Sequence, residues 1–219
     1  MSIAVMWFRQ DLRLEDNPAF TAACDHHELL PLYIYDTKKQ LQVGAAQDWW
    51  LHHSLQALSQ SLNQHQLQLC LRKGDSLSIW QELLQKHQIA AVYWNRCYEP
   101  ATIARDKKIK SWLKEQGIQV ITSNGLLFNE PWTITNQQGD YFKVFSAYWR
   151  HCMKGMQIPP VFQPKQFPHG VECQSESLID WHLLPQYPNW AEAFHSYWQP
   201  GAMGALCKLE HFIDAHLAH

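Results

Sequence analysis

The sequence predicts an α/β fold: a doubly wound, five-stranded parallel sheet, followed by a long linker and a short C-terminal helix. Five short apolar runs alternate with longer amphipathic stretches, and strands that alternate with helices in this way form parallel sheets covered on both faces. Beyond about residue 155 this periodicity is lost and prolines accumulate, which is typical of a linker. The 219 residues are enough for one large domain, or for one domain with an appendage.

The five expected strands are short apolar runs that end at polar or turn residues. They are Ile3–Phe8, Leu29–Tyr35, Leu67–Arg72, Ala90–Asn95 and Ile118–Ser123. No Gly-x-Gly-x-x-Gly sequence follows any of them, so the fingerprint of a dinucleotide-binding loop is absent. The walls of a ligand site would come instead from the loops after Phe8, Tyr35 and Asn95.

Three helices are expected between these strands. Asp48–Gln64 carries leucines at spacings of four, three and four residues, which places them on one helical face. Ser76–Gln88 has Ser76 as a candidate N-cap. Pro100–Gln116 begins with proline and ends before Gly117, as helices often do.

The remainder of the chain is expected to wrap over this domain. The segment is rich in prolines, which are Pro159, Pro160, Pro164, Pro168, Pro185 and Pro188. Helical spacing of apolar residues then returns in Gly201–His219.

Composition excludes several classes of protein. No apolar stretch approaches the roughly 18–20 residues that span a bilayer, and Arg9 follows the first apolar run rather than preceding it as in a secretory signal. We therefore expect a cytoplasmic protein. The six cysteines form no Cys-x-x-Cys pair, so we expect six reduced thiols and no zinc site. The 13 histidines show no metal-binding spacing, and most of the 11 tryptophans are expected in the core.

The charge of the chain makes it a poor candidate for a DNA-binding surface. Its net charge is −2, whereas proteins that hold DNA need a basic surface to neutralise phosphates. One modest basic cluster is expected to be the solvated face of a helix. It consists of Arg105, Lys107, Lys108 and Lys110.

The most informative stretch lies at the end of the first strand. There the apolar run breaks into charged and amide residues, namely Arg9, Asp11, Arg13, Asp16 and Asn17. In an open α/β sheet, ligands bind in the crevice outside the carboxyl ends of the strands. Two interpretations stay open: a ligand site, or a set of surface salt bridges around a loop.

Three motifs identify a family. They are Trp7-Phe-Arg-Gln-Asp-Leu-Arg-Leu-Glu-Asp-Asn17; Val92-Tyr-Trp-Asn-Arg-Cys-Tyr-Glu-Pro100 with Ala104-Arg-Asp106; and Gly125-Leu-Leu-Phe-Asn-Glu-Pro-Trp132 with Tyr141-Phe-Lys-Val-Phe-Ser-Ala-Tyr-Trp149. In this order and spacing they resemble the DNA photolyase and cryptochrome family over nearly the whole chain. The resemblance implies a Rossmann-like N-terminal antenna domain over residues 1–155 and an interdomain linker over 156–198. Residues 199–219 would be the first helix of an FAD-binding helical domain that is otherwise missing, so we expect a truncated chain.

The family resemblance also implies an activity. A full-length photolyase uses light and reduced FAD to split cyclobutane pyrimidine dimers, and it binds the damaged DNA through the helical domain. We therefore expect no catalytic residue in this chain, which would be inactive alone, and we expect a monomer. The alternative is the matching domain of a cryptochrome that acts in blue-light signalling. A third interpretation is a stand-alone nucleotide-binding α/β domain without a helical partner.

Antenna domains of this family bind a second chromophore, and its slot is expected above the first, second and fourth strands. The expected lining residues are Phe8, Arg9, Asp11, Tyr35, Asp36, Asn95, Cys97 and Glu99. For Asn95 and Glu99, a loop turn and a helix N-terminal carboxylate are equally open. Folate-binding members carry an Asn-Glu pair where this chain has Ala101 and Thr102. The resemblance therefore favours a deazaflavin or flavin over methenyltetrahydrofolate, or no antenna at all, with Arg9 and Asp11 as polar anchors.

Overall fold

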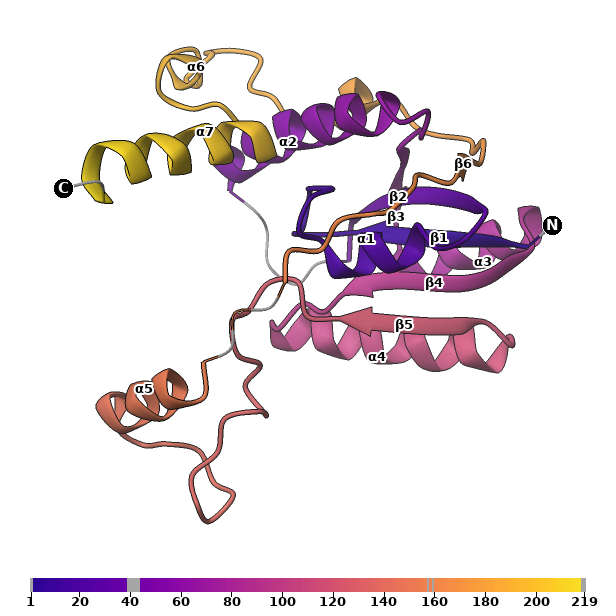
Figure 1. Ribbon diagram of the computed structural model, residues 1–219. Coiled ribbons are helices and arrows are strands. Elements are labelled where there is room, and N and C mark those ends of the chain that lie inside the picture. Colours follow the sequence, from indigo (N-terminus) through magenta and orange to yellow (C-terminus); the bar gives the residue numbers. More distant parts are fainter. Residues whose placement is uncertain (1, 39–43, 157, 159, 218–219) are drawn as a thin grey trace.

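The centre of the molecule is a parallel sheet, seen in a computed structural model that describes residues 2–38, 44–156, 158 and 160–217 (Figure 1). Its strands are β1 (Ile3–Phe8), β2 (Glu28–Asp36), β3 (Cys70–Gly74), β4 (Ile89–Asn95), β5 (Gln119–Ser123) and β6 (His169–Gly170). The main order is β3-β2-β1-β4-β5, and β6 pairs with β2. All pairs are parallel, which confirms the predicted doubly wound sheet.

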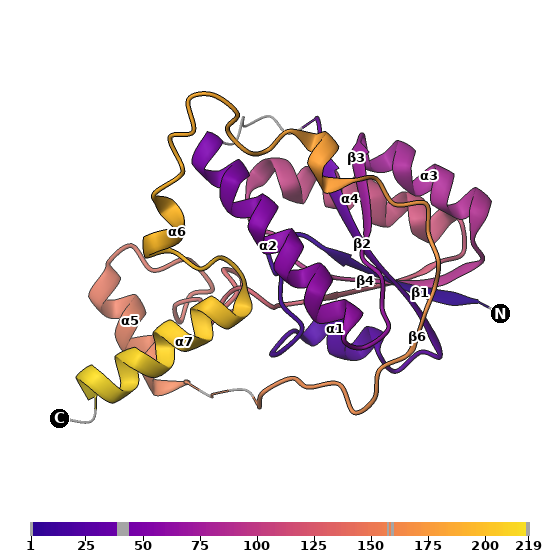
Figure 2. The same ribbon diagram turned by 90° about the horizontal axis from the view of Figure 1, so that it is seen from above.

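Helices cover both faces of the sheet (Figure 2). They are α1 (Pro18–Ala23), α2 (Ala45–Asn63), α3 (Ser76–Lys86) and α4 (Pro100–Glu115). Successive side chains of a strand point to opposite faces. Met6 and Phe8 therefore pack with α1 and α2, whereas Val5 and Trp7 pack with α3 and α4. All six β1 side chains are buried, as expected for a central strand of a parallel sheet.

Three tryptophans form the centre of the core on the α3–α4 side. The rings of Trp80 and Trp94 lie 5.6 and 5.5 Å from that of Trp7, both edge to face. All three side chains are at most 1% exposed. Edge-to-face pairs add to the free energy of burial, so these tryptophans have the packing role that the sequence predicts.

The first turns of two helices are fixed by side chains that accept hydrogen bonds from the backbone. Asn17 caps α1 by accepting from the N–H of Phe20. Asp75 caps α3 by accepting from the N–H of Ser78. The prediction of Ser76 as the cap is wrong by one residue, because its hydroxyl instead donates to Asp36 at 2.6 Å.

The chain after β5 adds short elements around the sheet. They are α5 (Phe145–Lys154), the 3₁₀ turn η1 (Leu178–Trp181), α6 (Phe194–Tyr197), α7 (Ala202–Phe212) and the π-helical turn η2 (Ile213–Leu217). Helix α5 extends away from the sheet, whereas α7 lies against α2 (Figure 1). Pro159 and the last two residues of the expected C-terminal helix lie outside the described residues. Among the described residues, no helix combines the length and apolar character needed to cross a membrane.

One expectation about the cysteines is wrong. Cys70 of β3 and Cys173 form a disulfide, so the chain does not hold six reduced thiols. The free cysteines of the described residues are Cys24, Cys97, Cys152 and Cys207. The two partners are 103 residues apart, and they meet because the chain after residue 168 pairs with β2 through β6 and then runs beside β3. Spacing along the sequence therefore could not reveal this bond.

Candidate functional site

The candidate site lies where the strand order reverses. From β3 the chain returns to the other side of β1 and forms β4. The carboxyl ends of β1 and β4 therefore flank the topological switch point, which is where ligands of open α/β sheets bind. The strands expected to carry the slot, β2, β1 and β4, are indeed neighbours.

A buried carboxylate and two amides join the loops after β1 and β4. The amide nitrogen of Asn95 donates to Asp11 at 2.5 Å and to Asn17 at 2.7 Å. Asp11 also accepts from the backbone N–H of Arg9 at 2.9 Å. Asp11, Asn17 and Asn95 are at most 2% exposed. A buried carboxylate must be hydrogen-bonded to be tolerated, and the two amides meet that need from inside the protein.

The guanidinium of Arg9 connects this cluster to α4. Its Nη1 lies 2.5 Å from the Asp106 carboxylate, and its Nη2 donates to the backbone carbonyl of Asn95. The same group lies over the rings of Trp7 and Trp94, at 4.9 and 5.6 Å from their centroids. Arg9 thus connects the carboxyl ends of β1 and β4 to the middle of α4 through cation–π contacts and an ion pair.

The ion-pair network extends to the end of β2 through Arg105. Its Nη2 lies 2.8 Å from Asp106, and its Nη1 lies 3.4 Å from Asp36. The expectation that Arg105 is part of a solvated face is wrong, because these two carboxylates draw it toward the sheet. Lys107 and Lys108 are exposed as expected.

Tyr35 lies to one side of this network. Its hydroxyl donates to Asp48 at 3.3 Å, and burial, followed by the charge and hydrogen bond of Asp48, raises the pKa of Tyr35. The ring of Trp181 lies 5.5 Å from that of Tyr35. Trp181 comes from the segment after β6, and nothing in its local sequence singles it out for this place.

Cys97 and Glu99 occupy the loop that leads into α4. Burial raises the pKa of the Cys97 thiol, so this cysteine is not poised as a nucleophile. Glu99 is exposed. It accepts hydrogen bonds from Gln10 at 2.7 Å and from Thr102 at 2.9 Å, and the bond from Gln10 contributes most to lowering the pKa of Glu99.

The structure therefore gathers the eight predicted site residues at one end of the sheet but gives them different surroundings. Arg9, Asp11, Asp36 and Asn95 belong to the buried polar network. Phe8 lies in the core, 5.8 Å from the ring of Phe20. Two hollows of about 450 and 510 Å³ are lined by other residues. Chemically, the network can fix loop geometry, and it places no free nucleophile or acid–base pair in an open cleft.

Four residues of this region were missed as site residues, namely Asn17, Arg105, Asp106 and Trp181. Three of them stand inside the sequence motifs, so a signal for them was present. A buried network needs charges of opposite sign and polar groups that satisfy them. The motifs offer both, since Arg105 and Asp106 are charged and Asn17 carries an amide. Only Trp181 lacks such a signal.

A parallel sheet of this strand order, with residues of the first two sequence motifs joined at its switch point, defines a class of protein. The DNA photolyase family model matches residues 4–169, and the chain belongs to this family. Over 97% of its length it is 41% identical to a deoxyribodipyrimidine photo-lyase of Agrobacterium fabrum, and it covers 45% of that protein. It is also 32% identical to cryptochrome-2 of Arabidopsis thaliana, over 97% of this chain and 36% of that one.

Solved structures agree with this assignment. A bacterial class III photolyase from Agrobacterium tumefaciens superposes with a TM-score of 0.91 at 39% identity, over 97% of this chain and 45% of the other. A cryptochrome from Synechocystis shares the fold, with a TM-score of 0.82 at 20% identity, over 97% of this chain and 46% of that one. The chain thus spans less than half of the length of these relatives.

Proposed function

We propose that this chain is the N-terminal part of a photolyase that uses light and reduced FAD to split cyclobutane pyrimidine dimers in DNA. The observation that carries the proposal is the 41% identity to a deoxyribodipyrimidine photo-lyase over 97% of the chain. Identity to plant cryptochromes is lower, at 32%. That similarity nevertheless supports a second candidate, a cryptochrome that acts in blue-light signalling.

In this proposal FAD is bound outside the chain's own sheet. The loop after β1 is the place where dinucleotide-binding proteins hold a pyrophosphate on glycines. Here that loop has no glycine, and it carries the Asp11 carboxylate, which is 2% exposed. A second negative charge would be repelled there. The residues present do not fit the dinucleotide, and no step of repair is assigned to them.

We further propose that residues 1–155 are an antenna domain, that 156–198 form the linker, and that 199–219 begin the helical domain. The antenna slot would lie at the carboxyl ends of β1, β2 and β4. Arg9 and Asp11 would act there by holding the loop in shape, because their charged groups are bonded to Asp106 and Asn95. Glu99, which is exposed, would face the ligand in this proposal.

A deazaflavin or flavin is the favoured antenna chromophore. Ala101 offers no polar group to a pterin, and the hydroxyl of Thr102 already donates to Glu99. Titration of the chain with deazaflavin, flavin mononucleotide and methenyltetrahydrofolate, followed by fluorescence, tests this choice. Tight folate binding that survives Arg9→Ala contradicts both the ligand and the role of Arg9. Binding of none of the three contradicts the antenna role.

Repair of a dimer-containing oligonucleotide under blue light separates the two candidate functions. We expect repair by the whole protein that contains this sequence, and neither repair nor retained FAD in the 219-residue chain alone. A whole protein that binds FAD but repairs no dimer supports the cryptochrome alternative. Repair by the 219-residue chain alone contradicts the proposal that FAD and the damaged DNA bind outside this chain.

Damaged DNA is proposed to bind elsewhere than on this chain, whose net charge is −2. We also propose a monomer located in the cytoplasm. A salt titration of DNA binding tests the first point, since a basic surface gives affinity that falls steeply with salt. Tight, strongly salt-dependent binding by this chain alone contradicts it.

A further inference from the structure

The segment 169–183, here called the strap, crosses the outer edge of the sheet. It begins with β6, which pairs with β2, and continues past β3 toward α2 (Figure 2). Val171 and Cys173 pack on the face covered by α3 and α4. Trp181 and Leu183 pack on the face covered by α2. The strap therefore passes from one face of the sheet to the other around β3, the edge strand.

Backbone groups on the free edge of β3 are bonded to the strap. The N–H of Leu71 donates to the Ser175 hydroxyl at 2.9 Å, and the Leu71 carbonyl accepts from the N–H of Glu176 at 2.9 Å. The N–H of Lys73 donates to the Glu176 carboxylate at 3.1 Å. A strand in the interior of the sheet would have a neighbouring strand on this side. At β3 the hydrogen bonds to the strap take the place of the bonds to such a neighbour.

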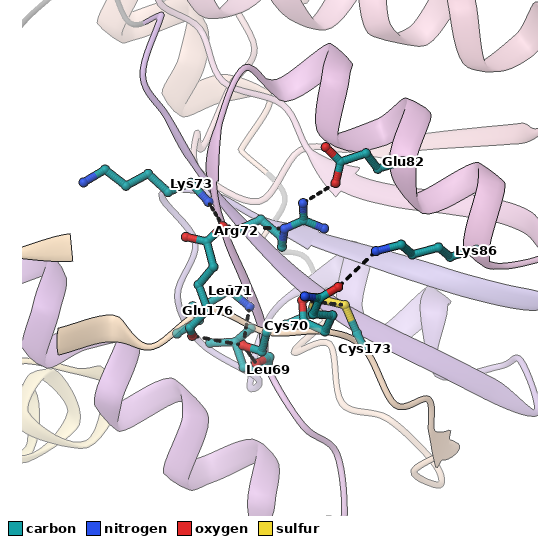
Figure 3. Close-up of a disulfide and its surroundings, with 11 residues drawn as sticks. Leu69, Cys70, Leu71, Arg72, Lys73, Glu82, Lys86, Cys173 and Glu176 are labelled. Carbon is teal, nitrogen blue, oxygen red and sulfur yellow. Dashed lines mark hydrogen bonds and ion pairs between the residues drawn. A yellow bond between two sulfur atoms is a disulfide. The ribbon is translucent and has the colours of Figure 1, made fainter. Parts of the chain in front are cut away.

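The disulfide between Cys70 and Cys173 lies in the middle of these contacts (Figure 3). Cys70 is 1% exposed, whereas Cys173 is half-buried. Two side-chain pairs also lie beside it, namely an ion pair of 3.6 Å between Arg72 and Glu176 and a hydrogen bond of 3.1 Å from Lys86 to the exposed Gln174. Partly exposed pairs of this kind contribute little, so the disulfide and the backbone hydrogen bonds of Leu71 and Lys73 are the main ties at this point of the strap.

We propose that the Cys70–Cys173 disulfide is a redox-sensitive clasp, which a dithiol reductant opens to release the strap from β3. A thiolate of the reductant attacks the sulfur of Cys173, the more exposed partner, and Cys70 leaves as a thiolate that takes up a proton. The second thiol of the reductant then attacks its own bound sulfur, and Cys173 is released as a thiol. The protein gains two electrons and two protons, and the reductant becomes a disulfide.

Opening the clasp acts on the candidate site through Trp181. The ring of Trp181 covers Tyr33 and Tyr35, at 6.2 and 5.5 Å, and its backbone carbonyl accepts from Lys73. A strap no longer tied at Cys173 leaves this place more often, because the loop of 103 residues is no longer closed covalently. The redox state of the Cys70–Cys173 pair thus changes how often the Trp181 ring covers Tyr35. The inference rests on these contacts alone and does not depend on the proposed function.

Hydrogen exchange of the 219-residue chain, with and without dithiothreitol, tests the clasp. We expect reduction to accelerate exchange in the strap and at the Leu71 and Lys73 amides by at least about tenfold. Cys173→Ser should exchange at the fast rate without reductant and show no further response. Cys207→Ser removes an exposed free thiol and should respond as the unsubstituted chain does.

Two results overturn the proposal. One is six reactive thiols in the chain unfolded without reductant, which would show that the bond does not form. The other is exchange in the strap that changes by less than about twofold on reduction, which would make the bond dispensable for docking. Comparing the oxidised and reduced forms of the unsubstituted chain needs no variant, so a folding defect in Cys173→Ser cannot hide either result.

Discussion

The tryptophans behave differently before and after the end of β5. Before that point Trp7, Trp49, Trp80 and Trp94 are at most 2% exposed, although Trp50 is 41% exposed, whereas Trp132, Trp149, Trp190 and Trp198 of the later region are 44 to 56% exposed. The exception is Trp181, which is 3% exposed because the strap docks it against the sheet. Most tryptophans before the end of β5 thus pack in the core, and most of those after it lie at the surface.

This difference shows which part of the chain forms a closed hydrophobic core and which part does not. In residues 3–38 and 44–123 the buried apolar side chains form two layers, one on each face of the sheet. In α5 and the loop before it, Tyr141, Phe145 and Trp149 remain at the surface. Stability should therefore respond sharply to substitutions in the first region and weakly to matched ones in the second.

The largest contrast is expected between Trp80→Ala and Trp149→Ala. Trp80 of α3 is fully buried against Trp7, so its truncation should lower the free energy of unfolding by about 4 kcal/mol. Trp149 is 50% exposed, and its truncation should change it by less than about 0.5 kcal/mol. Urea denaturation of both variants measures the difference. Equal losses would mean that α5 is part of the cooperative core.

The next contrast concerns two arginines. Arg9→Met leaves the Asp106 carboxylate with Arg105 alone and removes a donor from the Asn95 carbonyl. Breaking a buried ion pair in this way should destabilise the fold by about 3 kcal/mol. Arg150→Met, at an exposed position of α5, should be neutral within about 0.5 kcal/mol. If thermal unfolding shows both to be neutral, the buried network is not structural.

The third contrast compares alanine substitutions at two glycines, one packed against the buried network and one at the end of α5. A Cβ at Gly125 would lie 2.5 to 2.7 Å from the side chain of Asn95, which its bonds to Asp11 and Asn17 hold in place. Gly125→Ala should therefore cost about 2 kcal/mol. Gly155→Ala meets nothing closer than 4.0 Å and should be neutral within about 0.5 kcal/mol. A neutral Gly125→Ala would show that the Asn95 side chain can move.

The smallest effect is expected at the cap of α3, and it depends on pH. Asp75→Ala should cost about 1 kcal/mol, whereas Asp75→Asn keeps most of the cap. The hydrogen bond from the Ser78 hydroxyl is the largest cause that lowers the pKa of Asp75 below its ordinary value of 3.8. Its contribution is therefore complete above pH 3.8 and is lost as the pH falls through the lower folded value. Stability curves of Asp75→Asn should lack this acid-side loss.

The sheet and its faces could be predicted because their signals are local. The apolar run Ile3–Phe8 and the leucines of α2 each report burial by their own spacing. The charged loop after β1 was also found, since it interrupts such a run. Contacts between distant elements could not be predicted. The pairing of Arg105 with Asp36 and of Cys70 with Cys173 depends on strand order and on the path of the chain after β6.

The bonds between the strap and β3 also bear on how copies of this chain behave toward one another. An edge strand with free N–H and C=O groups is a template on which a second chain can add, and long flat edges promote aggregation. At Leu71 and Lys73 the strap already occupies those groups. The strap thereby keeps these groups from pairing with another chain, and its displacement would expose them at the edge of the sheet.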